Sequence, residues 1–152
     1  MPDPSITTAR TPRHALPYLF PGQTQKEAFV NEALARLDAL VQPGVIGEAA
    51  DPPAAPASGD SYIVGAQPQG EWTGHAGAIA IWSGSQWLFA MARPAMRVFD
   101  AAHGALAVCD GEGGWHRASD PPAPAGGTVQ DAEARSAIAA ILDGLRALGF
   151  FP

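Results

Sequence analysis

Between Ser61 and Ala118 the apolar residues alternate with a period of two, and glycine-containing turns separate the short apolar runs. The runs read SYIVG, AIAIWSG, QWLFAMA, MRVFD, ALAVCDG and WHRA. A period of two places successive side chains on opposite faces of a strand, and glycine adopts the positive φ angles that hairpin turns need. This stretch predicts a small antiparallel β module, either a meander or a barrel.

The β segment contains a weak internal repeat. Residues 80–87 read AIWSGSQW and residues 107–115 read AVCDGEGGW, so that both run from an apolar strand through a glycine turn to a tryptophan. We interpret the two copies as two hairpins of one sheet. Two copies are too few for a solenoid or a propeller.

A first helix is predicted before the β segment. Thr24 and Glu27 have the spacing of a capping box, and no glycine or proline follows until Pro43. Glu32 and Arg36 are spaced to form an i,i+4 ion pair. Apolar residues recur at steps of three and four and form one broad stripe, while the charged residues, Asp38 included, fall mostly on the other side. The stripe consists of Phe29, Val30, Ala33, Leu34, Leu37, Leu40 and Val41.

A second helix is predicted after the β segment. It begins at Thr128, with Asp131 three residues on, and ends at Gly149. Its apolar residues follow the a/d spacing of a heptad, and the candidate oligomerisation residues are Ile138, Ile141, Leu142, Leu145 and Leu148. The free-energy cost of the conformational entropy lost on ordering about 20 residues exceeds the free energy gained by burying these side chains. We therefore expect this helix to pack on its own domain or on copies of itself.

Prolines and glycines outside the β segment mark tethers. Gly and Pro together are 32 of 152 residues, from 17 and 15, yet 47% of the chain is hydrophobic, so we expect a folded module with flexible connections. The sequence predicts an α+β fold. Its parts are a flexible arm (1–15), a docking segment and first helix (16–42), a Pro/Ala-rich linker that crosses the surface (43–60), the β module (61–118), a second linker (119–127) and a C-terminal oligomerisation helix (128–152).

Four large apolar residues in the proline-rich N-terminal part would be costly to leave in water. They are Leu16, Tyr18, Leu19 and Phe20. We expect this segment to dock in an extended form, either on its own domain or on a neighbouring subunit or particle protein.

Composition disfavours several partners. Nine Lys and Arg against fifteen Asp and Glu give a net charge of −6, and the basic residues do not cluster, which argues against nucleic acid and an acidic membrane surface. No apolar run reaches the roughly 20 residues that cross a bilayer, and no signal peptide is recognisable. The single Cys109 excludes an internal disulfide and a multi-cysteine zinc site.

No residue is nominated as catalytic, metal-binding or cofactor-binding, and we expect no enzyme activity. A thiol nucleophile at Cys109 with His103 or His116 as base can be considered, but a cysteine ending an apolar strand usually behaves as a small hydrophobic residue. Residues 110–114, DGEGG, resemble a calcium loop in outline. They lack its series of alternating oxygen ligands, and a hairpin turn is the better interpretation.

Tryptophans gather in the β segment. Exposed Trp side chains on a small sheet are a usual platform for sugar rings, so Trp72, Trp82 and Trp87 are candidate glycan contacts. The alternative is that these rings cover the end of a small core.

The order of motifs resembles a domain family of uncharacterised function from alphaproteobacterial prophages and gene transfer agents, which are phage-like particles that package host DNA. The similar stretches are LPYLFPGQTQKEAFVNEALARLDALVQPGVIG, GDSYIVG, GEWTGHAGAIAIWSGSQWLF and the ending DAEARSAIAAILDGLRALGFF.

This resemblance implies a virion structural component assembled in the bacterial cytoplasm, without catalytic residues or a cofactor. Among such components, the chain most resembles a head spike base that links the capsid to a fibre protein. A head vertex implies a homopentamer and a fibre a homotrimer. The alternatives are a tail fibre protein and a glycan-binding module that contacts host capsule polysaccharide.

Overall fold

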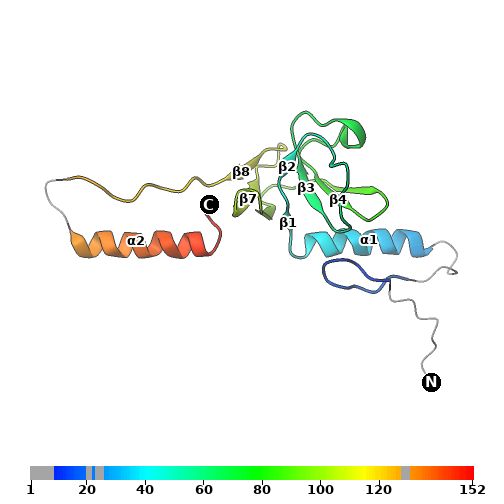
Figure 1. Ribbon diagram of the computed structural model, residues 1–152, viewed down its shortest axis with the longest axis horizontal. Helices are drawn as coiled ribbons and strands as arrows, with labels where there is room; N and C mark the ends of the chain where they lie inside the picture. Colours follow the sequence, from blue (N-terminus) through cyan, green and yellow to red (C-terminus); the bar gives the residue numbers. More distant parts are fainter. Residues whose placement is uncertain (1–8, 20–21, 23–25, 128–130) are drawn as a thin grey trace, which may run out of the picture.

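The computed structural model describes residues 9–19, 22, 26–127 and 131–152. They form a helix, a β module and a second helix, which confirms the predicted α+β class (Figure 1). The helices are α1 (Lys26–Leu40) and α2 (Ala132–Ala147), and a 3₁₀ turn, η1, covers Gly70–Trp72. The strands are β1 (Gly44–Val45), β2 (Glu48–Ala49), β3 (Ser61–Val64), β4 (Ile79–Trp82), β5 (Trp87–Ala90), β6 (Arg97–Asp100), β7 (Ala105–Cys109) and β8 (Trp115–Arg117).

The strands form two sheets with the same arrangement. One sheet has the order β1-β6-β7-β8 and the other β2-β3-β4-β5. In each, three consecutive strands make an antiparallel meander, and a two-residue strand pairs in parallel with its first strand. The two repeat copies are the hairpins β4–β5 and β7–β8, where Trp82 lies opposite Trp87 and Cys109 opposite Trp115. The hairpins are confirmed, but the prediction that they share one sheet is wrong.

The segment predicted as a surface linker supplies a strand to each sheet. Only Ile46 and Gly47 separate β1 from β2, and these strands pair with β6 and β3 respectively. Val45 is buried in the hydrophobic core. The expectation of a linker that crosses the surface is therefore wrong for residues 44–49, because the open edges of β6 and β3 need hydrogen-bonding partners that this short segment provides.

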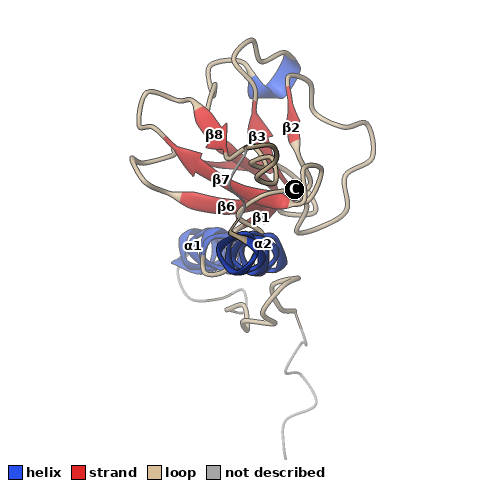
Figure 2. Cartoon of the chain, turned by 90° about the vertical axis from the view of Figure 1, so that its left-hand side faces the viewer, coloured by secondary structure: helices blue, strands red, loops and turns tan. Residues whose placement is uncertain are grey.

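The main core lies between the two sheets and α1. Alternation along the strands puts Ile63, Ile79, Ile81, Leu88 and Val98 on the inner faces, and Ala35 and Ala39 of α1 pack in the same cluster. Small alanine side chains let the helix axis approach the sheets closely. Figure 2 shows α1 below the strands, with its axis along the line of sight.

Helix α1 buries a different face from the one that its apolar pattern suggests. Its buried residues are Ala35, Asp38 and Ala39. Most of the apolar stripe points away from the core instead, with Phe29 79% exposed, and only Leu40 near its end packs partly buried against the core. The placement of Asp38 on the exposed side is therefore wrong, whereas the predicted Glu32–Arg36 ion pair is confirmed at 2.7 Å. The predicted cap, Thr24, lies outside the described residues.

A loop formed by residues 9–19 holds Asp38 in place. Thr11 Oγ1 donates a hydrogen bond to Asp38 Oδ1 at 2.5 Å, and the backbone N–H groups of Arg13 and His14 donate to the same carboxylate at 2.8 and 2.7 Å. Arg13 also donates from its guanidinium to the carbonyl oxygen of Gly44 at 2.8 Å. The predicted flexible arm is wrong for residues 9–15, since this loop joins α1 to the start of β1.

Helix α2 projects from the module and is attached to it at its C-terminal end (Figure 1). Asp131, rather than Thr128, is the N-cap, and its side chain accepts from Ala134 N; Thr128 lies outside the described residues. At the other end Phe150 N donates to Leu145 O, and Gly149 O accepts from Leu106 N of β7 at 2.7 Å. Arg146 forms an ion pair with Asp120 of the preceding linker. Neither described helix has the length and apolar character needed to span a bilayer.

Candidate functional site

The first candidate surface is the apolar stripe of α1. We call Phe29, Val30, Leu37 and Val41 the α1 open face, because these side chains are between 40% and 79% exposed. The core side of this helix carries Ala35, Asp38 and Ala39, so its large apolar side chains are left for solvent or for a partner. Apolar side chains gathered on one face of a soluble protein mark an interaction surface more often than isolated ones do.

The second candidate surface is on α2. Of the five predicted oligomerisation residues, Leu142 is buried, Leu145 is half-buried, and the remaining three are exposed. We call Ile138 and Ile141, together with Leu148 and Phe150 directly after the helix, the α2 open face; their exposed fractions lie between 42% and 68%. The expected packing of α2 on its own domain is therefore limited to its C-terminal end. Packing on another copy stays a prediction.

The predicted docking segment lies on its own chain. Leu16, Tyr18 and Leu19 are half-buried, and Phe20 lies outside the described residues. Leu19 exchanges two hydrogen bonds with the side-chain amide of Asn31 on α1, at 2.8 and 3.0 Å. The Asn31 amide thus satisfies both the backbone N–H and the carbonyl oxygen of Leu19, as a neighbouring strand would. Of the two expected docking places, the structure shows the intramolecular one.

A cluster of aromatic rings covers the outer face of the β2-β3-β4-β5 sheet. Trp82 and Trp87 have ring centroids 5.1 Å apart, and Trp72 and Tyr62 lie 5.1 and 6.2 Å from Trp87. Trp72 comes from η1 and is 0% exposed, so its prediction as a glycan contact is wrong: the ring closes a second small core with Val64 and Ala80. Trp82 and Trp87 are half-exposed, and their role as glycan contacts stays a prediction.

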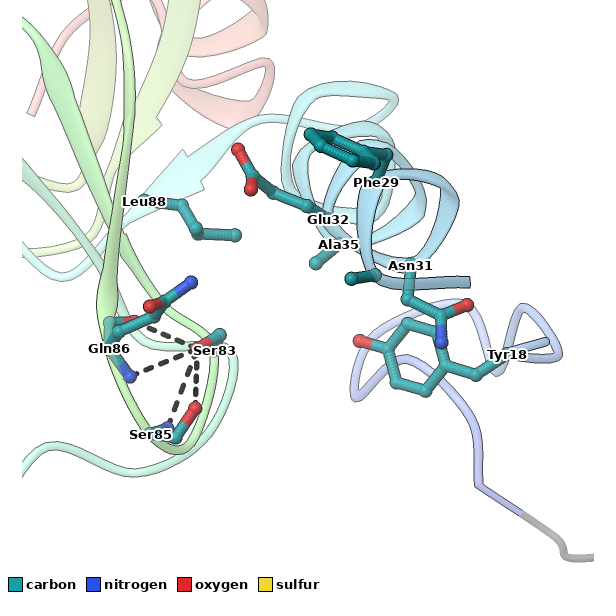
Figure 3. A pocket seen from close by; sticks show the side chains of 10 residues that line it. Tyr18, Phe29, Asn31, Glu32, Ala35, Ser83, Ser85, Gln86 and Leu88 are labelled. Atoms are coloured by element: carbon teal, nitrogen blue, oxygen red, sulfur yellow. Dashed lines mark hydrogen bonds between the residues drawn. The ribbon is translucent and has the colours of Figure 1, made fainter. Parts of the chain in front are cut away.

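A cleft lies on the other side of the same hairpin, between α1 and the β4–β5 turn (Figure 3). Its volume is about 340 Å³. Tyr18, Phe29 and Leu88 give it apolar walls, and its polar groups are the side chains of Asn31, Glu32, Ser83, Ser85 and Gln86. Because Leu88 and Trp87 are adjacent in one strand, the cleft and the aromatic cluster lie on opposite faces of this hairpin.

A charge network centred on the buried Asp100 joins the two sheets. Asp100 of β6 accepts from Arg117 Nε of β8 at 2.6 Å, and Arg117 also donates to Glu48 of β2 at 3.2 Å. His103 lies 2.9 Å from the same carboxylate. Burial alone would raise the pKa of Asp100, but the hydrogen bonds and positive charge of Arg117, with His103, hold it below its usual value. This network fixes strand positions, since every member is engaged within the chain.

Most of the residues considered for catalysis or calcium binding lie in the β7–β8 hairpin, whereas His103 lies in the turn between β6 and β7. Cys109 is buried, and its Sγ accepts from Gly111 N at 3.3 Å. Asp110 accepts from the backbone N–H groups of Glu112 and Gly114, and it lies 3.0 Å from His116 Nε2. The carboxylate thus caps its own turn, as the hairpin interpretation expects. Within the described ranges no group of three or more His, Cys, Asp or Glu side chains is arranged to hold a metal ion.

Comparison with known proteins gives one match. Residues 30–116, more than half of the chain, match a family described as protein of unknown function (DUF2793). The matched region runs from within α1 to within β8, so it contains the α1 open face except Phe29, both sheets except Arg117, and the aromatic cluster. A search of curated proteins found no match, and a search of solved structures found none. The chain therefore belongs to the DUF2793 family.

Proposed function

We propose that this protein is an oligomeric structural component of a phage-like particle, namely a head spike base or adaptor that links a gene transfer agent to a receptor-binding fibre. One observation carries the oligomeric part of the proposal. Helix α2 projects from the module with Ile141 and Leu148 61% and 68% exposed, an arrangement that costs free energy in a monomer and is removed by association.

The particle itself is proposed from the resemblance of the sequence to prophage and gene transfer agent proteins. Two features of the structure support a role as a particle component. The β module is braced by the Arg117 network, and the projecting helix is available to a neighbour. A rigid body with an apolar projecting element is what a repeated joint in a symmetric assembly needs.

Removal of residues 128–152 tests the oligomeric role. We expect the shortened chain to keep its β structure by circular dichroism and to have a lower mass by light scattering than the full chain. A double variant, Ile141→Ser with Leu148→Ser, keeps the backbone contact of Gly149 with β7 and should show the same loss of mass. A full-length mass in both variants would contradict the proposal. Immunogold labelling of purified particles then tests the location.

A second candidate function is binding of host surface polysaccharide. It is favoured by Trp82 and Trp87, two half-exposed rings in contact on the outer face of a sheet. Aromatic faces stack on the apolar faces of sugar rings. Trp82→Ala should abolish binding to a capsule glycan array, and Trp82→Phe should retain part of it. Absence of binding by the intact oligomer would contradict this function.

A further inference from the structure

Two apolar helix faces of this chain lie open without a partner among the described residues. We propose that they are each other's partners: the α2 open face of one copy packs on the α1 open face of a second copy. This inference rests on the proposed oligomeric function and names its interface. It differs from the simpler arrangement in which two α2 helices pack on each other.

The chain's own helices do not make this contact. In Figure 1 both helix axes follow the long axis of the molecule, with α1 under the module and α2 beyond its far end. Figure 2 shows both helices end-on in the same view, which agrees with parallel axes. The backbone bond between Leu106 and Gly149 fixes the C-terminal end of α2 at β7. The helices therefore lie end to end within one chain, and only a second copy can bring an α2 helix beside α1.

The two faces match in length and in size. Helix α1 has 15 residues and α2 has 16, so each is about 23 Å long. Each open face consists of four large side chains that are roughly half-exposed on average. A subunit that covers both faces removes roughly 800 Å² of its surface from water, about the area that each partner contributes to a stable complex.

Gly144 gives independent support for a close neighbour on α2. Glycine in the interior of a helix is less favourable than alanine, and a Cβ added to Gly144 would meet nothing within 4 Å among the residues that the structure describes. Packing against those residues therefore does not require a glycine there. The position adjoins Ile141 and Leu148 on the helix surface and leaves a gap beside them. A gap between large side chains receives a large side chain of a facing helix, and Phe29 on α1 is 79% exposed.

Pairing of α1 with α2 also covers more of the molecule than pairing of α2 with itself. An α2–α2 contact would leave the whole α1 open face in water. Made head to tail and closed by rotation, this contact gives a ring, and made reciprocally it gives a two-fold dimer in which each α2 covers the other subunit's α1. Both forms leave the chain without an unpaired helix face.

Cysteine cross-linking of full-length chains tests the contact, with Cys109→Ala as background. The α1 variants are Phe29→Cys, Leu37→Cys and Val41→Cys, and the α2 variants are Ile141→Cys and Leu148→Cys. Each α1 variant is mixed with each α2 variant, one of the two carrying a size tag. We expect at least one mixed pair to give about ten times more disulfide-linked product than the same α1 variant mixed with Ser136→Cys, because a disulfide needs Cα atoms within about 7 Å. Ser136 lies on the side of α2 opposite the open face.

The outcomes separate this inference from the function on which it rests. Strong self-linking of Ile141→Cys or Leu148→Cys alone, with no mixed product, would show α2–α2 packing and overturn the inference while the oligomer stands. An oligomer in which no mixed pair links would also overturn it. A monomeric full-length chain would overturn the oligomeric function itself. Gly144→Leu should, in addition, lower the oligomer mass without loss of helix signal in circular dichroism.

Discussion

At the scale of single residues, Asp38 is a charged side chain that is only 1% exposed. Burial alone would raise its pKa, but the hydrogen bond from Thr11 and those from the backbone N–H groups of Arg13 and His14, with the charge of His14, bring the pKa below 3.8. A carboxyl group with a lowered pKa stabilises the fold in its ionised form. The stabilisation is present above the unfolded-state value near 3.8 and is lost as the pH falls through the lower folded-state value.

Replacement of this carboxylate tests the loop that it holds. Asp38→Asn should lower the free energy of unfolding by about 2 kcal/mol at pH 7, because charge-assisted hydrogen bonds are lost from a buried site. The measurement is urea denaturation at pH 7 and at pH 3. The difference between variant and wild type should shrink at pH 3, and a difference that is equal at both values would contradict the assigned role.

Gly77 and Gly74 form a matched pair for a second test. Both have positive φ angles, 73° and 86°. A Cβ on Gly77 would lie 2.7 Å from backbone atoms of Gly113, whereas one on Gly74 would meet no described atom within 4 Å. Gly77→Ala should therefore lower the free energy of unfolding by about 3 kcal/mol. Gly74→Ala should lower it by about 1 kcal/mol, because this change adds backbone strain without a steric clash. Thermal unfolding checks the difference, and equal effects would show that the turns do not touch.

At the scale of elements, the orientation of α1 gives opposite expectations for two neighbouring positions. Leu37 is 51% exposed, so Leu37→Ser should change the subunit's free energy of unfolding by no more than about 0.5 kcal/mol. Ala39 is buried in the main core, and Ala39→Leu should cost about 2 kcal/mol through overpacking. Denaturation at concentrations where the chain is monomeric provides the comparison. The reverse order of effects would mean that the apolar stripe faces the core.

The elements themselves were predictable from periodicity, and their partners were not. Steps of three and four located both helices, and glycine turns followed by a tryptophan located the β4–β5 and β7–β8 hairpins. The stripe of α1 could not reveal which side faces the sheets, because Asp38 becomes compatible with burial only through donors 24 to 27 residues away. A pattern within one helix contains no information on such distant donors.

The candidate surfaces were predictable to a similar extent. Sequence spacing identified the apolar residues of α2, and three of the five are exposed. It could not distinguish Trp72 from Trp82, because exposure depends on η1 folding back over the sheet. The cleft beside Asn31 was missed, since its walls come from α1, the N-terminal loop and a hairpin more than 50 residues further on. No local sequence signal marks such a juxtaposition.

At the scale of the whole molecule, the two sheets are equivalent in strand order and differ in what their outer sides contact. Sheet β2-β3-β4-β5 has its own small aromatic core, whereas sheet β1-β6-β7-β8 receives the C-terminal end of α2 through Leu106 and Gly149. The first sheet thus offers rings to solvent, and the second anchors the projecting helix. One duplicated arrangement serves two separate tasks at the two ends of the module.

Strands β1 and β2 belong to different sheets, and the short segment that contains both should slow the exchange of amide hydrogens with solvent in each sheet. Amides of Phe99 and Ala101 donate to residues 43–49 from one sheet, and those of Ile63 and Gly65 donate to them from the other. Exposing these amides requires this segment to detach from a sheet, and its Val45 is buried in the main core, so all four should exchange only when the core opens. Exchange measured by mass spectrometry should show the peptides that contain these four amides among the slowest regions of the chain, and residues 119–127 among the fastest.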